Sequence, residues 1–334
     1  MKTTKSKYCQ FLLSSQINYT CTYLGEHSSE LSHDSVNRYL RDAHLTPRDV
    51  WEYIGPEVEQ VEHGYVIFDD TVLSKVHSHN IQMVRRQYSG NSHGIIKGIG
   101  VVNCVYCNPL RDEYWVIDYR IFDPERDGKT KIDHVMDMLK LLKHRGVKFS
   151  TVLMDSWYAT TAIMMYLISE QRTFYCPIKS NRKVDDSKGV APYRQVQDMV
   201  WTEAEMHQGK TVKLHKFPMD NYLKLFRVAV STNRTEYIVT NDMTQDNAGD
   251  ALWESAVRWN VERFHREEKQ TTGIERCQCR SQRAQRNHIA AAITVWGFLK
   301  KTARSLHKSV YRVKHQLLDE YIKAQLLSPS LVFA

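Results

Sequence analysis

The sequence lacks the features that mark several classes of protein. Its longest apolar run, residues 289–299, falls well short of the ~20 residues that cross a bilayer. No leader with an apolar core precedes the first polar segments, and there are no internal repeats or low-complexity tracts. The seven cysteines are odd in number, which does not suit a fully paired disulfide framework. These absences predict a protein of a reducing cytosol with no membrane-spanning segment.

A zinc site has little support in the cysteine pattern. Cys104 and Cys107 have the spacing of a metal-binding pair, but they lie in an apolar run, and no second pair at zinc-finger spacing accompanies them. Packing of both cysteines in a hydrophobic core is the alternative, and the absence of a second pair at zinc-finger spacing favours it.

Acidic residues are scarce near the C-terminus. The whole chain has 46 Lys and Arg against 38 Asp and Glu, a formal net charge of +8. Residues 271–316 contain ten basic side chains and a single acid, Glu275. A segment of this composition is suited to contact with phosphates, and we select Arg280 and Arg283 as candidates.

The length of 334 residues allows two or three domains. Residues 1–60 have the pattern of short helices joined by polar turns. In the helix predicted over residues 32–43, Val36 and Leu40 face inward. The outward residues suit a recognition helix in the major groove of DNA; they are His33, Asn37, Arg38 and Arg41. An ordinary amphipathic bundle helix would show the same pattern, so both readings stay open.

From residue 65 the pattern changes to an α/β order. Runs rich in β-branched and aromatic residues predict strands, at 65–70, 94–107, 113–122, 149–155 and 174–180. A capped amphipathic segment predicts a helix at 130–146, and a second helix is predicted at 160–170. Three further strand-like runs form a β-rich segment, at 211–217, 222–231 and 235–242. We therefore expect a mixed sheet flanked by helices and interrupted by a β-rich insertion.

Two of the predicted strands end in acids. Asp70 ends the first strand, and Asp155 ends the apolar strand of residues 149–155. Ligands of open α/β sheets bind at the carboxyl ends of strands, so both are candidate site residues. Asp155 is alternatively a simple cap for the next helix. Alternation along the strand turns Asp69 away from Asp70, so only one of these two should face a shared site.

A third acid lies on a predicted helix of mixed character. Arg258, Glu262 and Lys269 fall on one stripe of this helix. A separate apolar stripe would hold the helix against a core; it consists of Trp253, Val257, Val261 and Phe264. A solvated face with i,i+4 ion pairs is the alternative. Together with Asp70 and Asp155, Glu262 would complete a set of carboxylates suited to Mg²⁺, and two such ions can catalyse phosphoryl transfer.

These residues resemble those of a known family. The element order, with acids in FDDT, LMDSWY and RWNVE, is similar to the RNase H-like core of DDE transposases. The spacing resembles in particular the signature Y-x2-R-x3-E-x6-K of a bacterial insertion-sequence group. Arg258, Glu262 and Lys269 match this signature, whereas Ser255 replaces its tyrosine. The resemblance runs from about residue 60 to residue 300.

The resemblance implies that Asp70, Asp155 and Glu262 bind two Mg²⁺ ions, with Mn²⁺ able to substitute. It implies a homodimer on double-stranded DNA that cleaves the terminal inverted repeats and transfers 3′-hydroxyl ends to target DNA, in the bacterial cytosol or nucleoid. A transposase-derived repressor and an RNase H-like nuclease are the alternatives. The intact acid triad argues against the repressor, and the insertion and the helix-turn-helix candidate argue against the plain nuclease.

The resemblance also divides the chain. It implies a helical DNA-binding domain (1–60), a core in two parts (61–180 and 250–300), a β-rich insertion domain (181–249) and a basic helical tail (301–334). Further candidate DNA contacts are Arg258, Lys269, Arg266, Lys179, Asn181 and Arg182, where a solvated loop is the alternative for the last three. Trp201, in the insertion, would stack on a flipped base as an aromatic residue does in such families, or belong to a core.

Overall fold

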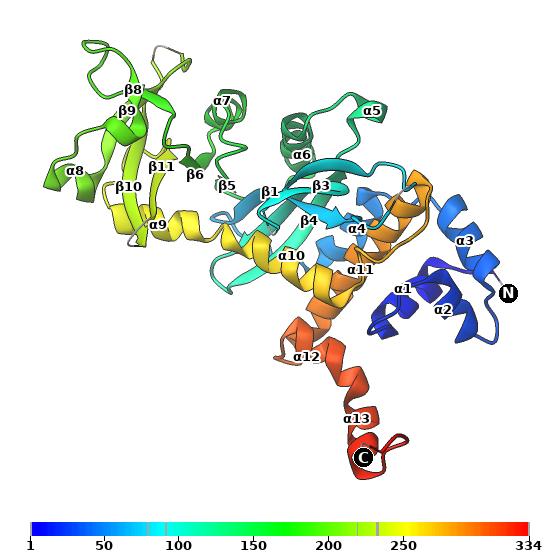
Figure 1. Cartoon of the computed structure of the whole chain (residues 1–334). Coiled ribbons are helices and arrows are strands. Elements are labelled where there is room, and N and C mark those ends of the chain that lie inside the picture. The colour runs from blue at the N-terminus through cyan, green and yellow to red at the C-terminus, as the bar shows by residue number, and fades with distance from the viewer. Residues whose placement is uncertain (1, 79, 91, 219, 232–233, 333–334) are drawn as a thin grey trace.

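A long mixed sheet runs through the middle of the computed structural model, which describes residues 2–78, 80–90, 92–218, 220–231 and 234–332 (Figure 1). Its strands are β1 Tyr65–Ser74, β2 Arg85–Ser89, β3 Gly94–Asn108, β4 Glu113–Ile121, β5 Thr151–Met154, β6 Thr173–Ile178, β7 Lys183–Asp185, β8 Arg194–Gln195, β9 Lys210–Leu214, β10 Leu223–Ser231 and β11 Arg234–Thr240. Their order is β2-β3-β1-β5-β6-β11-β10-β9-β7-β8, and β4 pairs with β3.

Helices precede, connect and follow these strands. They are α1 Lys5–Ser14, α2 Cys21–Glu26, α3 His33–Asp42, α4 Pro47–Ile54, α5 Pro124–Asp127, α6 Lys131–His144, α7 Thr161–Ser169, α8 Glu203–Gln208, α9 Ala248–Ala256, α10 Trp259–Thr271, α11 Gln282–Ser305, α12 Val310–His315 and α13 Asp319–Leu327. In the ranges that the structure describes, no helix is both long and apolar enough to cross a membrane.

The centre of the sheet brings the middle of β1 beside the carboxyl end of β5. The prediction that Asp70 ends the first strand is wrong, because β1 stays paired with β3 as far as Ser74. β1 is antiparallel to β3 and parallel to β5, and β5 is parallel to β6. All four residues of β5 are buried, as expected for a strand covered on both faces. The register pairs Phe68 with Met154, so the acids that follow them, Asp69 and Asp155, are level with each other. The expected mixed sheet flanked by helices is confirmed, with α6 and α7 on one face and α10 on the other (Figure 1).

The β-rich segment is joined to the sheet by strand pairing. β11 pairs antiparallel with β6, and β10 and β9 follow in turn. In Figure 1 this segment forms the end of the molecule farthest from the N-terminal helices. The central sheet therefore continues into the segment predicted as an insertion.

The N-terminal helices pack against α11. The Tyr8 hydroxyl lies 2.8 Å from Nδ1 of His288 in α11. The Asn287 side chain donates to the carbonyls of Leu40 and Ala43, at 2.7 Å each. Residues from α1 to α4 belong to the same hydrophobic core as the central strands, which is compatible with the division at residue 60 but does not test it.

The predicted apolar stripe through Trp253 is wrong. α9 ends at Ala256 and α10 begins at Trp259, with Arg258 at its N-cap. The helix is interrupted because the N–H groups of residues 257 and 258 bond to carbonyls three residues earlier, at Glu254 and Ser255. Val261 and Phe264 are buried as expected, whereas Trp253 is 60% exposed.

Candidate active site

Four carboxylates gather in one cleft beside the middle of β1 and the carboxyl end of β5, and a fifth acid, Glu236 of β11, also lines this cleft. The cleft has a volume of about 1470 Å³, and Asp69, Asp70, Asp155 and Glu262 all contribute to its wall. Asp69 and Asp70 come from β1, Asp155 directly follows β5, and Glu262 lies in the first turn of α10. The parallel pairing of β1 with β5 and the packing of α10 on β1 bring them together.

Asp70 is held by two neighbours. The Tyr158 hydroxyl donates to Oδ1 at 2.6 Å, and Nζ of Lys131 lies 2.5 Å from Oδ2. Lys131 is the first residue of α6, which is capped by Thr130. The negative charge of Asp70 is therefore balanced by a cation that the start of α6 positions.

Asp69 and Asp155 share a poorly solvated position. Burial and, after it, the charge of Asp155 together raise the pKa of Asp69 to about 8, although Arg258 opposes the shift. Burial also raises the pKa of Asp155, which accepts backbone hydrogen bonds from Trp157 and Tyr158. Thr160, and not Asp155, caps α7. The expectation that only one of Asp69 and Asp70 would face the site is wrong, because both line the cleft from the middle of β1.

Arg258 connects two of the acids. Its Nη1 lies 3.2 Å from Oε1 of Glu262 and 3.7 Å from Oδ2 of Asp69. The guanidinium also lies 4.9 Å from the ring centre of Trp259. The i,i+4 ion pair considered from the sequence is thus present, and it faces the cleft.

Lys269 points elsewhere. Its Nζ donates to the carbonyl of Val72 at 2.9 Å and lies 3.4 Å from Glu275. Neither Lys269 nor the exposed Arg266 is among the described residues that line the cleft. Lys269 therefore joins α10 to β1 in this structure.

The loop after β6 contributes one of its three predicted residues. Lys179 lines the cleft, and its Nζ lies 5.4 Å from the ring centre of Trp157. Asn181 is exposed, and Arg182 donates to Thr161 at 3.5 Å. Among the described residues, neither of these two reaches the cleft wall.

Other predicted DNA contacts lie away from the cleft. In α3, Val36 and Leu40 are buried and His33, Arg38 and Arg41 are exposed, as expected, whereas Asn37 accepts from the Cys279 thiol. In the insertion, half-buried Trp201 has Nζ of Lys210 5.6 Å from its ring centre. Near α11, Arg280 is exposed and Arg283 lines a second hollow.

Several cleft residues were not found by sequence reasoning. Trp157 is 60% exposed and Trp259 is 48% exposed, and both line the cleft. His265 bonds to the Asn103 amide at 2.9 Å, and burial lowers its pKa to about 3. Trp157 and Trp259 stand beside the motif acids in LMDSWY and RWNVE, so adjacency was an available signal. Lys131 and His265 gave no signal in the sequence, because only the folding of the chain places them at the cleft.

The donor chemistry of the cleft fits a divalent cation. Carboxylate oxygens are the preferred ligands of hard cations, and a cation would relieve the repulsion between Asp69 and Asp155. Across the described part of the chain, however, no three His, Cys, Asp or Glu residues are already arranged to hold a metal ion. Arg258 and Lys131 are the cations that now neutralise the acids. Cys104 and Cys107 are buried in the hydrophobic core, as the alternative to a zinc site predicted.

The comparisons with known proteins identify a family. Residues 63–298 match the model described as transposase DDE domain, a range that contains Asp69, Asp70, Asp155 and Glu262. The comparison with curated proteins found no match. Proteins of this family act on DNA and generally use divalent metal ions. Since the match spans well over half of the 334 residues, the chain belongs to the transposase DDE-domain family.

Proposed function

We propose that this transposase cleaves the ends of its own element and joins the freed 3′-hydroxyl groups to target DNA. The observation that carries the proposal is the convergence of Asp70, Asp155 and Glu262 on one cleft that Arg258 and Lys179 also line. Acids and cations side by side suit a phosphodiester substrate, because the reaction needs charge stabilisation and positioning more than covalent chemistry.

Asp70, Asp155 and Glu262 are the proposed ligands of two Mg²⁺ ions, with Mn²⁺ able to replace them. When bound, such ions stabilise the attacking and leaving oxygens of an in-line displacement. Arg258 and Lys131 attract the DNA phosphates to the same cleft. Water and then the DNA 3′-hydroxyl serve as nucleophiles, so no serine or tyrosine of the chain has to form a bond to DNA.

The proposed substrates are the terminal inverted repeats of the element and a target duplex. We place the protein in the insertion-sequence group with the Y-x2-R-x3-E-x6-K signature, acting as a homodimer on DNA in the bacterial cytosol or nucleoid. Ser255 stands at the tyrosine position of that signature, is 8% exposed and lines the cleft. Other groups of this chain must therefore make the phosphate contact that a tyrosine hydroxyl would make at this position.

The test is a cleavage assay with DNA that carries the terminal sequence flanking the reading frame. In Mg²⁺, the wild-type protein should cut at the repeat end and leave a 3′-hydroxyl. Asp155→Asn should bind this DNA but cut more than about 100-fold more slowly, since even losing a residue that only orients a metal ligand costs 10- to 100-fold.

The control is Glu203→Gln, which removes an exposed acid from α8 and should cut at the wild-type rate. Equal cutting by wild type and Asp155→Asn would refute the assignment of the acids. Specific binding without cutting by the wild type would identify a repressor, and cutting without end specificity or strand transfer would identify a nuclease.

A further inference from the structure

A second hollow of about 850 Å³ lies between α4, the end of β4, α6 and the start of α11. Its wall is strongly basic, with two histidines and two acids, Glu52 and Asp127, beside six arginines. We call it the arginine groove, after Arg48, Arg120, Arg126, Arg145, Arg283 and Arg286. The arginines come from separate elements and are distributed along the hollow.

Part of this positive charge is not neutralised by nearby acids. Arg48 pairs with Glu52 at 2.8 Å, Arg286 pairs with Asp123 at 2.8 Å, and Arg120 pairs with the buried Asp118. Arg126 and Arg145 instead have neutral partners: Arg126 donates to the Gln282 amide at 3.4 Å, and Arg145 donates to a carbonyl at 3.2 Å. Burial lowers the pKa of Arg145, and neighbouring arginines lower it further while Asp118 opposes them. The groove is therefore short of negative charge.

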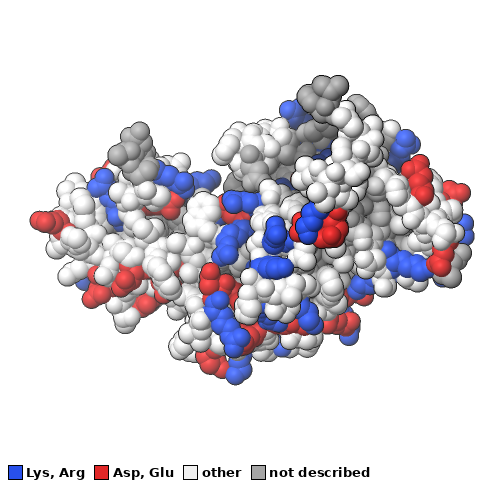
Figure 2. All heavy atoms as spheres, turned by 90° about the horizontal axis from the view of Figure 1, so that it is seen from below, with Lys and Arg blue, Asp and Glu red and all other residues white. Residues whose placement is uncertain are grey.

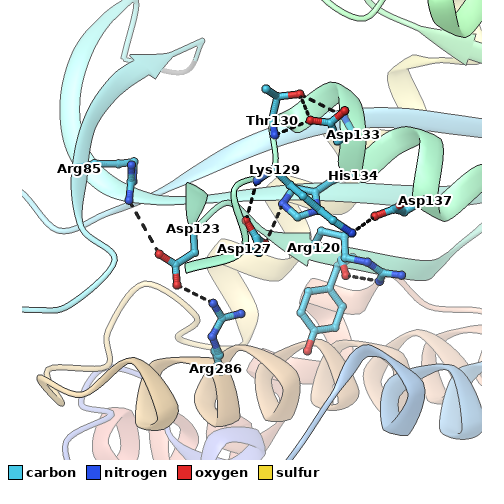
Figure 3. A network of polar contacts seen from close by, with 11 residues as sticks. Arg85, Arg120, Asp123, Asp127, Lys129, Thr130, Asp133, His134, Asp137 and Arg286 are labelled. Carbon is cyan, nitrogen blue, oxygen red and sulfur yellow. Dashed lines mark hydrogen bonds and ion pairs between the residues drawn. The ribbon is translucent and has the colours of Figure 1, made fainter. Parts of the chain in front are cut away.

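A network of ion pairs fixes the wall between the groove and the catalytic cleft. Figure 3 shows Asp123 between Arg85 of β2 and Arg286 of α11, and Asp127 beside His134 of α6. These contacts hold residues 120–131 in place. Within that segment, Ile121 and Arg126 line the groove, whereas Phe122 and Lys131 line the cleft. The two hollows thus lie on either side of one ordered segment.

We propose that the arginine groove binds the phosphate backbone of duplex DNA outside the catalytic cleft. Guanidinium groups bind phosphate oxygens in a planar, two-pronged geometry, and the N-terminus of the long helix α11 adds a favourable dipole. Arginines spread over four elements suit a row of phosphates better than a single one. The inference rests on the proposed function, because DNA that leaves the cleft across residues 120–131 meets the groove.

Figure 2 shows one face of the molecule, on which Lys and Arg are interspersed with Asp and Glu. Mixed charge of this kind is ordinary for a protein surface. The excess of arginine over acid in the groove is what distinguishes it as a phosphate site.

The test compares the double variant Arg126→Gln/Arg283→Gln with Arg111→Gln. Arg111 is an exposed arginine at the opposite end of the β3–β4 hairpin, paired with Glu59. Binding of a fluorescein-labelled 40-base-pair duplex is measured by anisotropy over a range of KCl concentrations. Each lost phosphate contact lowers the slope of log K against log salt by about one, so the double variant should lose about two and Arg111→Gln should lose none.

Two further measurements separate the possible outcomes. Thermal stabilisation by sodium phosphate and by ATP is compared in wild type and double variant, after circular dichroism has shown that both are folded. An unchanged DNA slope overturns the proposal; if phosphate or ATP stabilisation is lost at the same time, the groove is a site for a small anion. The same salt slope is measured for Asp155→Asn. Loss of cleavage with an unchanged slope in this variant would show that the catalytic acids and the groove act separately, so that the groove proposal can fail without the proposed function failing.

Discussion

At the scale of single residues, the adjacent acids Asp69 and Asp70 differ in their surroundings. The register of β1 with β5 places Asp69 level with Asp155, and Asp69 also contacts Arg258. Asp70 contacts Lys131 and Tyr158 instead. The two side chains therefore interact with different partners from opposite faces of one strand, although both line the cleft.

We expect Asp70→Asn to slow cleavage more than about 100-fold, as for a metal ligand, whereas Asp69→Asn should slow it by less than about 10-fold. Oδ1 of Asp69 accepts a hydrogen bond from its neighbour's N–H at 2.8 Å, and asparagine can keep that bond while losing only the charge that Arg258 balances. Single-turnover cleavage in Mg²⁺ measures both variants. If Asp69→Asn were the slower enzyme, Asp69 would replace Asp70 in the triad.

At the scale of elements, local signals were readable and distant pairings were not. The cap at Thr130 and the buried pair Val36 and Leu40 follow from nearest-neighbour chemistry, and the structure has both. The break between α9 and α10 was missed because apolar spacing continues across it. The Lys131 contact with Asp70 joins residues 61 positions apart, so no local pattern could predict it. Asp70, Asp155 and Glu262 could be selected from the sequence because each stands in a recognisable local motif, and all three line the cleft.

The start of α6 is an element whose geometry should affect both stability and chemistry. Thr130 and Asp133 form a capping box. Lys131, which directly follows Thr130, is paired with Asp70. Thr130→Ala should lower the free energy of unfolding by about 1 kcal/mol. Cleavage should slow as well, because the frayed first turn no longer holds Lys131 beside Asp70.

The matched control is Thr202→Ala, which removes the same capping box from α8 away from the described residues of the cleft. Denaturant unfolding should show a similar loss of stability in both variants, and only Thr130→Ala should be slower in cleavage at a temperature where both are folded. A similar slowing in Thr202→Ala would show that stability alone, and not the position of Lys131, sets the rate.

At the scale of the whole molecule, the N-terminal helix α1 contacts the C-terminal helix α12. Lys314 in α12 is 1% exposed, and its Nζ donates to the carbonyls of Leu12 and Leu13 at 2.9 and 2.6 Å. These carbonyls end α1, where a cation is favoured by the helix dipole. Together with the contacts of Tyr8 and Asn287 on α11, this links the N-terminal helices to the C-terminal segment.

Lys314→Met should therefore lower the free energy of unfolding by about 2–3 kcal/mol, because hydrogen bonds to a charged group contribute about 1.5–3 kcal/mol and two carbonyls lose their donor. Lys308→Met is the control, since Lys308 is exposed and contacts only the Gln316 amide in the described structure. Urea unfolding followed by tryptophan fluorescence and by circular dichroism measures both. Because α1 to α4 share their hydrophobic core with α11, the wild type should unfold in one transition by both probes. An early transition of the N-terminal helices, unchanged in Lys314→Met, would instead show that they fold as a separate domain.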